Sequence, residues 1–358
     1  MSRIDFFAQQ KNNALFKSFL KDREVQEGKK SFFAKKFSFP PAKPITYRKV
    51  FIMKVLITGG AGFIGSHIAE YFQGKAEVVV LDNLRSGHKE NLNGLDVKFI
   101  EGDICDRAAV REAMQGVDYV FHLAAMISVP ESMFKIEECI KINNTGMINV
   151  LEEAADAKVK KLCFSTSAAI YGDNPEMPKR EVMIPEPKSP YAITKLDGEY
   201  YCNMFTQTGR LQTACLRYFN VFGPRQDPKS AYAAAIPIFT AKAVAGEDIT
   251  IFGDGEQTRD FIYVKDIVEA NVFMATHDFT GVYNIAYGGK ITINDLVKRI
   301  KDKVNSTSKI VYLPERPGDV KHSMAAIDKL KSTGFVHKYD FNEGMDATIE
   351  YFKNLKKA

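Results

Sequence analysis

The stretch "KVLITGGAGFIG" (54–65) joins a short apolar run to three glycines spaced three residues apart. The run 54–58 is nearly continuous, which is typical of a strand buried on both faces. Gly59, Gly62 and Gly65 follow, and residues 63–72 have a helical pattern. Glycine is needed where a chain turns tightly and its backbone approaches a pyrophosphate, whose charge the amino terminus of the next helix stabilises. The stretch therefore predicts a strand, a turn and a helix that bind a dinucleotide.

An acidic residue supports this interpretation. Asp82 ends the second apolar run and lies 20 residues after Gly62. A carboxylate at that place can accept hydrogen bonds from the ribose hydroxyls of the adenosine. Its charge would repel the 2′-phosphate of NADP, so the sequence favours NAD. Arg85, three residues on, weakens that preference a little.

The same alternation of strand and helix continues along the chain. Apolar runs at 76–82, 97–103, 117–125 and 160–167 are expected to be buried strands, with helical patterns between them, including 107–115 and 133–157. This order predicts an α/β fold, a Rossmann-type doubly wound parallel sheet with right-handed crossovers. After about residue 220 the pattern loosens, and 223–237 and 252–261 are expected to be rich in loops.

These patterns predict three parts of the chain. Residues 53–222, with about 260–290, form the NAD-binding domain, and residues 223–259 and 291–358 form a smaller, discontinuous substrate lobe. Residues 1–52 are a basic leader with 12 Lys/Arg and 4 Asp/Glu, whereas the remainder has 37 and 40. The leader has no apolar core of a secretory signal, and we favour a non-catalytic extension or an upstream start over a functional basic arm.

Composition excludes several classes of protein. No apolar run approaches the roughly 20 residues that a membrane helix needs. The excess positive charge lies in the leader, so we do not expect the remainder to bind nucleic acid. The six histidines form no metal-binding signature, so we expect no metal. The five cysteines include no CxxC pair, which indicates a reducing compartment, and we expect a cytoplasmic protein.

The motif "SPYAITK" (189–195) supplies candidate catalytic residues. Ser189 and Pro190 form a helix start, and Tyr191 and Lys195 are one helical turn apart, so they share a face. A nearby ammonium favours the phenolate and lowers the pKa of a tyrosine, which can then take a proton from a sugar hydroxyl. The same spacing in Tyr71 and Lys75, at the far end of the first helix, is interpreted as an ordinary surface pair.

Further motifs give a resemblance that covers roughly residues 53–355. The glycine spacing, "GDI" (102–104), "HLAA" (122–125), "FSTSAAIYG" (164–172), the YxxxK pair and "LRYFNVFGPRQDP" (216–228) resemble the extended short-chain dehydrogenase/reductase family. Within it the chain is similar to nucleotide-sugar 4-epimerases that act on UDP-sugars. The resemblance implies that NAD is tightly bound and not consumed. It also implies that Tyr191 takes the proton of the 4-hydroxyl while the hydride passes to NAD, and that the 4-keto sugar turns before the hydride returns.

The resemblance also assigns roles to individual residues. Ser167 hydrogen-bonds the reacting oxygen and completes the catalytic set with Tyr191 and Lys195. Arg259 and Arg316 grip the diphosphate. The implied cofactor-binding residues are Gly59, Gly62, Phe63, Ile64, Gly65, Asp82, Asn83, Ser86, Gly87, Asp103, Ile104, Leu123, Ala124, Ala125, Asn143, Tyr191, Lys195, Tyr218 and Phe219. The implied substrate-binding residues are Ser128, Ser167, Tyr191, Asn220, Phe252, Arg259, Arg316, Asp319 and Ser323.

The resemblance makes Ser323 the gate beside the C2 substituent of the sugar. Family members restricted to glucose and galactose have a tyrosine there, whereas members that accept N-acetylated sugars have a small residue. UDP-N-acetylglucosamine and UDP-N-acetylgalactosamine are therefore the expected substrates, with UDP-glucose and UDP-galactose possible. The family usually forms homodimers through helices of the first domain, so we expect a homodimer.

Other functions remain open at this point. A 4,6-dehydratase needs an acid pair after the Ser/Thr, where this chain has Ala168 and Ala169. A nucleotide-sugar decarboxylase typically has a glutamate in the same stretch. A uronate 4-epimerase is a further alternative, because tolerance of a 6-carboxylate is not readable from the sequence. An NAD-binding regulator without catalysis is a remote alternative, since Ser167, Tyr191 and Lys195 are all present.

Overall fold

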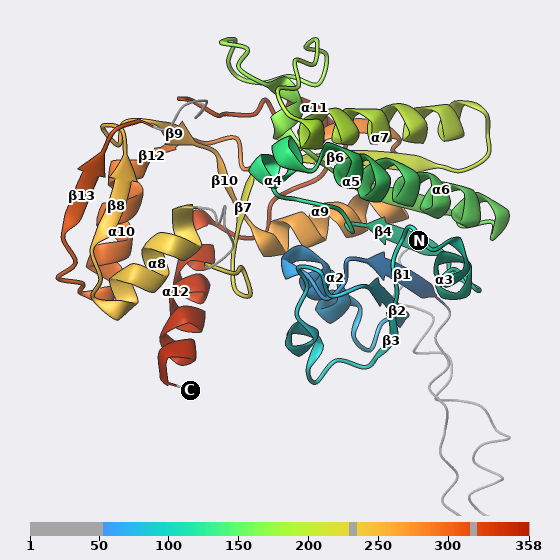
Figure 1. Ribbon diagram of the computed structural model, residues 1–358, viewed down its shortest axis with the longest axis horizontal. Helices are drawn as coiled ribbons and strands as arrows, with labels where there is room; N and C mark the ends of the chain where they lie inside the picture. The colour runs from blue at the N-terminus through green and yellow to red at the C-terminus, as the bar shows by residue number, and fades with distance from the viewer. Residues whose placement is uncertain (1–52, 229–234, 316–320, 358) are drawn as a thin grey trace, which may run out of the picture. The chain divides into compact units, whose positions relative to one another are not determined.

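The computed structural model describes residues 53–228, 235–315 and 321–357, which lie within one compact unit spanning residues 51–358 (Figure 1). Three of the sequence predictions fall outside the described residues. They are the leader 1–52, Arg316 and Asp319.

A seven-stranded parallel sheet forms the centre of the fold. Its spatial order is β3-β2-β1-β4-β5-β6-β11, and every neighbouring pair is parallel. The doubly wound parallel sheet expected from the sequence is therefore confirmed. The order reverses between β1 and β4, and ligands of such sheets bind at the carboxyl ends of the strands beside that reversal. The strands are β1 (Lys54–Thr58), β2 (Glu77–Asp82), β3 (Val97–Glu101), β4 (Tyr119–His122), β5 (Lys161–Ser167), β6 (Thr213–Tyr218) and β11 (Gly281–Ile285).

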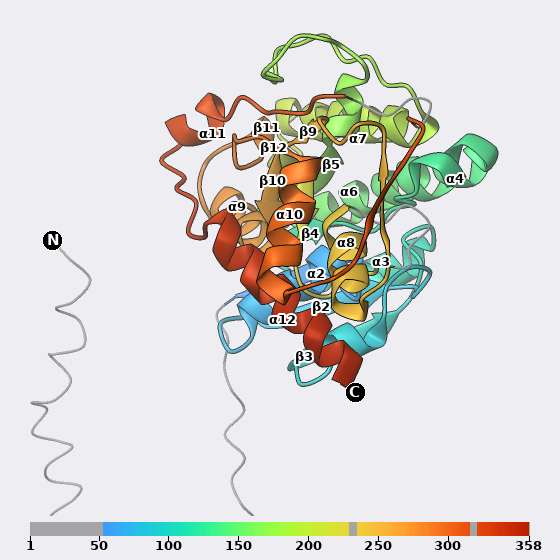
Figure 2. The ribbon, with the colours of Figure 1, turned by 90° about the vertical axis from the view of Figure 1, so that its left-hand side faces the viewer.

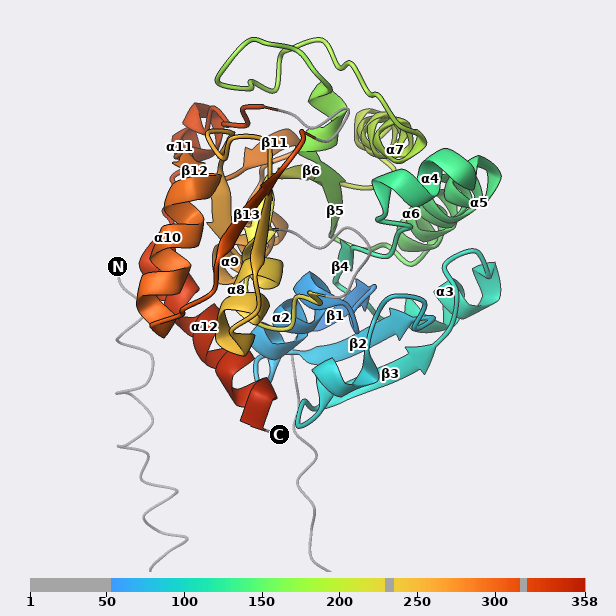
Figure 3. The same cartoon turned by 60° about the vertical axis from the view of Figure 1, so that its left-hand side comes forward.

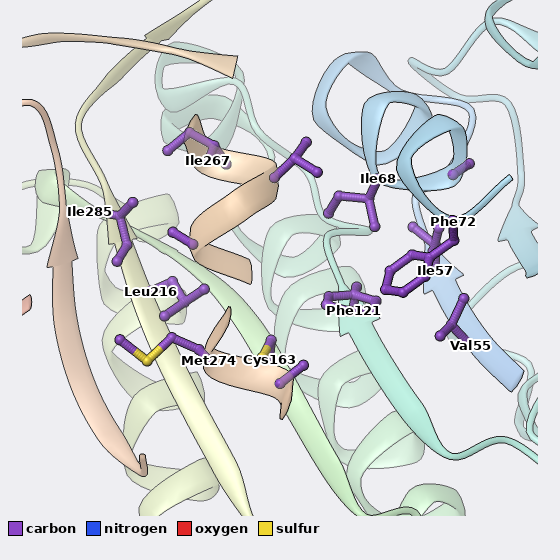
Figure 4. Close-up of a cluster of buried hydrophobic side chains, with 14 of the residues drawn as sticks. Val55, Ile57, Ile68, Phe72, Phe121, Cys163, Leu216, Ile267, Met274 and Ile285 are labelled. Carbon is purple, nitrogen blue, oxygen red and sulfur yellow. The ribbon is translucent and has the colours of Figure 1, made fainter. Parts of the chain in front are cut away.

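Helices cover both faces of this sheet because its strands are apolar on both sides. Val55 and Ile57 belong to an apolar cluster that also contains side chains of α2 (Phe63–Phe72) and α9 (Val264–Thr276), and Figure 4 shows part of this cluster. Leu56, between them, belongs to the opposite cluster, which contains side chains of α3 (Arg107–Ala113), α6 (Gly146–Asp156) and α7 (Pro190–Gln207). Figure 3 shows α6 and α7 on one side of the sheet and α2 and α9 on the other.

The helix expected at 133–157 is interrupted in the structure. It divides into α4 (Val129–Phe134), α5 (Ile136–Ile140), a π-helical turn η3 (Lys141–Thr145) and α6. The 3-10 turns η2 (Lys89–Leu92) and η4 (Ala168–Tyr171) follow β2 and β5. A single turn of π-helix inside a helical run commonly marks a functional region, and this one contains Asn143.

A second apolar core lies in the carboxyl-terminal half. It joins α8 (Ala235–Ala245), β8 (Ile249–Phe252), α10 (Ile293–Val304), β13 (Ile310–Leu313) and α12 (Phe341–Lys357), and Figure 2 shows its three helices facing the viewer. Residues 235–237 begin α8, so the expectation of a loop was wrong for them.

Short elements link this core to the large sheet. Strand β7 (Asn220–Phe222) pairs with β10 (Phe261–Tyr263), and β9 (Thr258–Arg259) pairs with β12 (Ile291–Thr292). The small helix α11 (Asp328–Ser332) contacts β11. The predicted domain boundaries remain a prediction, because all these elements belong to one unit.

No described helix is long and apolar enough to cross a membrane. Among residues 53–228, 235–315 and 321–357, no group of three or more His, Cys, Asp or Glu side chains could hold a metal ion. The five cysteines form no disulfide.

A buried carboxylate in the first turn of α9 makes the stability of the fold depend on pH. Asp266 is 0% exposed, and its Oδ1 accepts the backbone N–H of Lys338 at 2.8 Å. Burial raises the pKa of Asp266 to about 6, although that hydrogen bond lowers it. A raised pKa means that the folded state holds the proton more tightly. Its stabilising contribution is therefore present below the unfolded pKa of about 3.9 and is lost as the pH rises through the folded value.

We predict that Asp266→Asn flattens this dependence, because the amide still accepts the N–H of Lys338 but cannot ionise. Between pH 4.5 and pH 7.5 the free energy of unfolding of the variant, relative to the parent, should increase by about 1–2 kcal/mol. Urea titrations of both proteins at the two pH values measure it. A constant difference would contradict the assignment.

Candidate active site

The turn between β1 and α2 is built by close backbone approach. Gly59 has a φ of +71°, and a Cβ on it would lie 2.7 Å from the backbone nitrogen of Ala124. A Cβ on Gly65 would lie 2.3 Å from the carbonyl oxygen of Gly59. Gly62 precedes α2 and provides no side-chain cap, and the first turn of the helix contains no acidic residue. The N–H groups of this helix end therefore remain available to a bound anion such as a pyrophosphate.

Asp82 lies at the carboxyl end of β2, beside this turn. Its carboxylate accepts the N–H groups of Ala61 at 3.0 Å and Leu84 at 2.8 Å. Burial raises the pKa of Asp82, and these two hydrogen bonds lower it. Arg85 forms ion pairs with Glu131, at 2.8 Å, and with Glu138. The positive charge that weakened the preference for NAD is thus already paired with two carboxylates.

A first cavity of about 270 Å³ opens over these elements. Its walls are the glycine turn, the ends of β2, β4 and β5, and the start of α7. A helix amino terminus and a carboxylate at the end of the second strand in one cavity fit a dinucleotide. Seventeen of the nineteen predicted cofactor-binding residues line this cavity: Gly59, Gly62, Phe63, Ile64, Gly65, Asp82, Asn83, Ser86, Gly87, Asp103, Ile104, Leu123, Ala124, Ala125, Tyr191, Lys195 and Tyr218.

Asn143 and Phe219 do not line the first cavity. Asn143 is buried, and its side chain bonds the backbone N–H of Met126 at 2.7 Å and the hydroxyl of Thr194 at 2.9 Å. It therefore holds the loop after β4 against α7 instead of lining the cavity. Phe219 lines a second cavity.

The predicted substrate residue Ser128 lines none of the described cavities. Its hydroxyl accepts the N–H of Glu131 at 3.1 Å and caps α4.

The start of α7 places two predicted catalytic residues in the first cavity. Ser189 caps the helix by accepting the N–H of Ala192 at 3.2 Å, and Pro190 occupies the first helical position. Tyr191 and Lys195 follow on the same face, and Lys195 Nζ donates to the carbonyl oxygen of Ser165 at 2.8 Å. Ser167 lies at the end of β5, and its side chain lowers the pKa of the Tyr191 phenol by hydrogen bonding.

The other tyrosine–lysine pair lies elsewhere. Lys75 Nζ is 3.6 Å from the ring centroid of Tyr71, and Tyr71 lines a separate cavity of about 160 Å³.

The expected effect of Lys195 on the pKa of Tyr191 is not found. Burial raises the pKa of the Tyr191 phenol, and the bond from Ser167 lowers it. Burial also lowers the pKa of Lys195 to about 8. The ammonium lies 5.8 Å from the centre of the Tyr191 ring and is bonded to Ser165, so desolvation outweighs its attraction for a phenolate. Without ligands the phenol is therefore protonated at neutral pH.

A second cavity, of about 730 Å³, adjoins the first. Ser167, Tyr191, Tyr218 and Val221 line both cavities, so the phenol lies where the two meet. Ser323 lines the second cavity, and its N–H donates to the carbonyl of Thr258 at 3.1 Å.

A third cavity, of about 530 Å³, continues this groove. Asn220 and Arg259 line both the second and the third cavities, and Phe252 lines the third. Arg259 Nη1 donates to the carbonyl of Thr258 at 3.0 Å. The predicted substrate residues of the described chain, except Ser128, therefore line one continuous groove.

Some lining residues were not predicted from the sequence. Thr166 lines the first cavity, and Lys179, Lys188, Gln226 and His322 line the second. Thr166 could have been found, because it precedes Ser167 at the end of a predicted strand. The other four lie in segments without periodicity, where sequence gives no direction for a side chain.

Comparisons with known proteins agree with this geometry. Residues 55–286 match the NAD dependent epimerase/dehydratase family. UDP-N-acetylglucosamine 4-epimerase from Methanobrevibacter ruminantium M1 is 42% identical, with 86% of this chain and 100% of that chain covered and a TM-score of 0.82. UDP-glucose 4-epimerase from Thermotoga maritima is 40% identical, with coverage of 85% and 100% and a TM-score of 0.81. The UDP-glucose 4-epimerase of Thermus thermophilus, solved as a complex with NAD, is 36% identical, with coverage of 84% and 99% and a TM-score of 0.78.

A relative with a different reaction is also similar. UDP-N-acetyl-alpha-D-glucosaminuronate decarboxylase from Bacillus cytotoxicus is 33% identical over 85% of this chain and 98% of its own. The match of the family model over most of the chain, and relatives above 30% identity along almost their whole length, establish the family. The chain belongs to the NAD-dependent epimerase/dehydratase family, with NAD as its cofactor.

Proposed function

We propose that this protein is a UDP-sugar 4-epimerase. The observation that carries the proposal is the position of Tyr191 and Ser167. They line both the first cavity, which fits a dinucleotide, and the adjoining second cavity of about 730 Å³. A hydroxyl bound in the second cavity can there face a proton acceptor and the cofactor at once. The similar UDP-sugar 4-epimerases support the same reaction.

Bound NAD supplies a positively charged ring and a reversible hydride acceptor, and so permits a transient 4-keto sugar. The side chains of the protein handle the proton. Tyr191 takes the proton of the 4-hydroxyl and returns it after the sugar has turned, and Ser167 holds the reacting oxygen by a hydrogen bond. Because burial raises the pKa of Tyr191, its role as a base requires the positive charge that ligands bring into the cavity.

The nucleotide anchors the substrate away from C4. Arg259 lies where the second and third cavities meet, and a guanidinium there suits a diphosphate because its forked donors bind two oxygens. Asn220 lines the same junction. Phe252 lines the third cavity, where its ring can lie against the uracil. The diphosphate arginine Arg316 and the ribose-binding Asp319 belong to the same proposal but lie outside the described residues.

We propose UDP-N-acetylglucosamine and UDP-N-acetylgalactosamine as the preferred substrates. Ser323 lines the second cavity, called the sugar cavity from here on, together with Ser167 and Tyr191. Its small side chain leaves room for an acetamido group. The relative from Methanobrevibacter ruminantium M1, named as a UDP-N-acetylglucosamine 4-epimerase, supports this choice. UDP-glucose and UDP-galactose also fit a cavity of this size.

Three related reactions are alternatives. A dehydratase needs an acid pair after the Ser/Thr, and Ala168 and Ala169 line the sugar cavity at that place. A decarboxylase or a uronate epimerase would act on a sugar with a 6-carboxylate. Chromatography of the products from UDP-N-acetylglucosamine, UDP-glucose and UDP-glucuronate separates these reactions, because only an epimerase equilibrates two isomers without loss of water or CO₂.

A homodimer is the proposed assembly. Exposed apolar side chains lie on the adjoining helices α5 and α7: Ile136, Ile140, Ile193, Tyr200 and Met204 are 45–60% exposed. Contiguous exposed apolar residues mark interaction surfaces. Ile193, Tyr200 and Met204 are spaced seven and four residues apart and so form one stripe along α7.

The first prediction of the proposed function concerns the base. Tyr191→Phe keeps the ring and removes the group that moves the proton, so the turnover number should fall by about 10²–10⁴. NAD content, measured after denaturation, should equal that of the parent. Turnover close to the parental value would exclude Tyr191 from proton transfer.

The second prediction concerns the gate. Ser323→Tyr should abolish turnover of the acetamido sugars, because a close-packed wall yields the extra volume only at a cost of about 1–3 kcal/mol or more. Turnover of UDP-glucose should be retained or improved, and Ser323→Ala is the matched control that stays small. Unchanged epimerisation of UDP-N-acetylglucosamine by the tyrosine variant would contradict the role of Ser323.

The third prediction concerns the dimer. Tyr200→Glu places a charge in the stripe on α7 and should yield a monomer in sedimentation experiments, since burying an unpaired carboxylate is costly. Val336→Glu, at an exposed apolar residue outside the stripe, is the control and should leave the mass unchanged. A dimer of the Tyr200 variant with parental stability would place the interface elsewhere.

A further inference from the structure

A buried ion pair joins α7, which carries Tyr191 and Lys195, to β6, the neighbour of the strand that carries Ser167. Glu199 on α7 and Arg217 on β6 are each 3% exposed. Arg217 Nε donates to Glu199 Oε1 at 2.9 Å, and Arg217 Nη2 donates to Glu199 Oε2 at 2.7 Å. The Thr166 hydroxyl donates to the same Glu199 Oε1 at 2.8 Å. The carboxylate thus joins α7 to two neighbouring strands.

The position of this group along the chain relates it to the reaction. Tyr191, Lys195 and Glu199 are four residues apart and therefore share one face of α7. Thr166 immediately precedes Ser167 on β5, and its register partner on β6 is Arg217. Ser167 is therefore one residue from Thr166. Lys195 and Tyr191 are one and two helical turns from Glu199.

The same group continues towards the sugar cavity. The guanidinium of Arg217 lies 4.8 Å from the ring centroid of Tyr171, whose hydroxyl donates to Asn284 Oδ1 at 2.6 Å. Asn284 Nδ2 donates to the carbonyl oxygens of Lys179, at 2.9 Å, and Ala326, at 3.3 Å. Lys179 lines the sugar cavity, and Ala326 follows the segment that contains Ser323.

Stability alone is a poor explanation for such an arrangement. Desolvating two charges costs several kcal/mol, and well-packed apolar residues often serve stability as well or better. What a buried pair joined by two parallel hydrogen bonds provides is a single register between the elements it joins. Here those elements carry the groups that must lie within hydrogen-bonding reach of one sugar oxygen.

We infer that Glu199, Arg217 and Thr166 are positioning residues, which fix the Tyr191 phenol and the Ser167 hydroxyl relative to each other. None of them needs to contact the sugar. The expected changes in turnover rest on the proposed function. The expected effect on the register of α7 on β5 does not.

The mildest test removes one hydroxyl and keeps its shape. Thr166→Val deletes the bond to Glu199, so the turnover number should fall about 10-fold, because small misplacements of reacting groups reduce rates strongly. KM should stay within about twofold, since substrate-anchoring groups are untouched. Thr166→Ser keeps the donor and should restore at least half of the parental rate. NAD content is measured in each variant, because Thr166 also lines the cofactor cavity.

A matched control lies on the same helix and the neighbouring strand. Thr206, near the end of α7, contacts the hydroxyl of Thr213 at the start of β6 at 2.8 Å. Thr206→Val removes a comparable link between these elements away from the cavities, and its turnover number should remain parental. Equal losses of turnover in Thr166→Val and Thr206→Val would show that the buried group stabilises the fold without positioning the catalytic residues, and would overturn the inference.

A double-mutant cycle with Tyr191→Phe gives a second readout. Once the phenol is gone, Thr166→Val should cause no further loss of the residual rate, because there is no hydroxyl left to position. Multiplicative losses in the double variant would show that Thr166 acts independently of Tyr191, against the inference.

A third readout does not depend on any activity. Amide hydrogen exchange of the first turns of α7, residues 190–198, should accelerate in Thr166→Val and stay parental in Thr206→Val. If the parent epimerises no UDP-sugar, the proposed function fails, and this measurement alone decides the register. Identical exchange in parent and Thr166→Val would overturn the inference.

Discussion

The fold of the site depends on the contact between the first turn and the end of β4. Any side chain at residue 59 would lie 2.7 Å from the backbone nitrogen of Ala124, so glycine is required for the two loops to meet. This contact places the amino terminus of α2 beside the strand ends where the sheet order reverses. Because parallel strands bring all their carboxyl ends to one edge, Asp82, Ser167 and the start of α7 then line a common cavity.

Local signals predicted the elements with the strongest patterns. The structure places β1 at Lys54–Thr58 and α2 at Phe63–Phe72, as the apolar run and the helical pattern indicated. Ser189 caps α7, as its place before Pro190 suggested. The interruption of the helix at 133–157 could not be predicted, because the π-helical turn contains Asn143, whose bonds to Met126 and Thr194 are tertiary contacts. The start of α8 was missed because residues 223–237 have no helical period.

For some side chains along the groove the residue type is enough to predict the chemistry, and for others it is not. A carboxylate after the second strand and a guanidinium keep their charge and their hydrogen-bonding groups in most surroundings, so residue type and spacing suffice to suggest a role. Tyr191 is different, because its pKa depends on burial, and burial is a property of the folded chain. The sequence suggested a phenol activated by Lys195, whereas in the structure burial raises the pKa of the phenol and lowers the pKa of the Lys195 ammonium to about 8.

The raised pKa of Tyr191 and the lowered pKa of Lys195 determine which groups are charged before ligands bind. A buried phenol with a raised pKa does not act as a base before ligands bind, and a buried ammonium with a pKa of about 8 keeps most of its charge at neutral pH. In the proposed reaction, proton transfer then depends on the positive charge of the cofactor and on the distance between the phenol, Ser167 and the sugar oxygen. The cofactor brings the positive charge, but the fold of the protein must set the distance between the phenol and Ser167. The bidentate pair of Glu199 and Arg217, with its bond from Thr166, is the buried structure that joins α7 to β5 and β6 at that place.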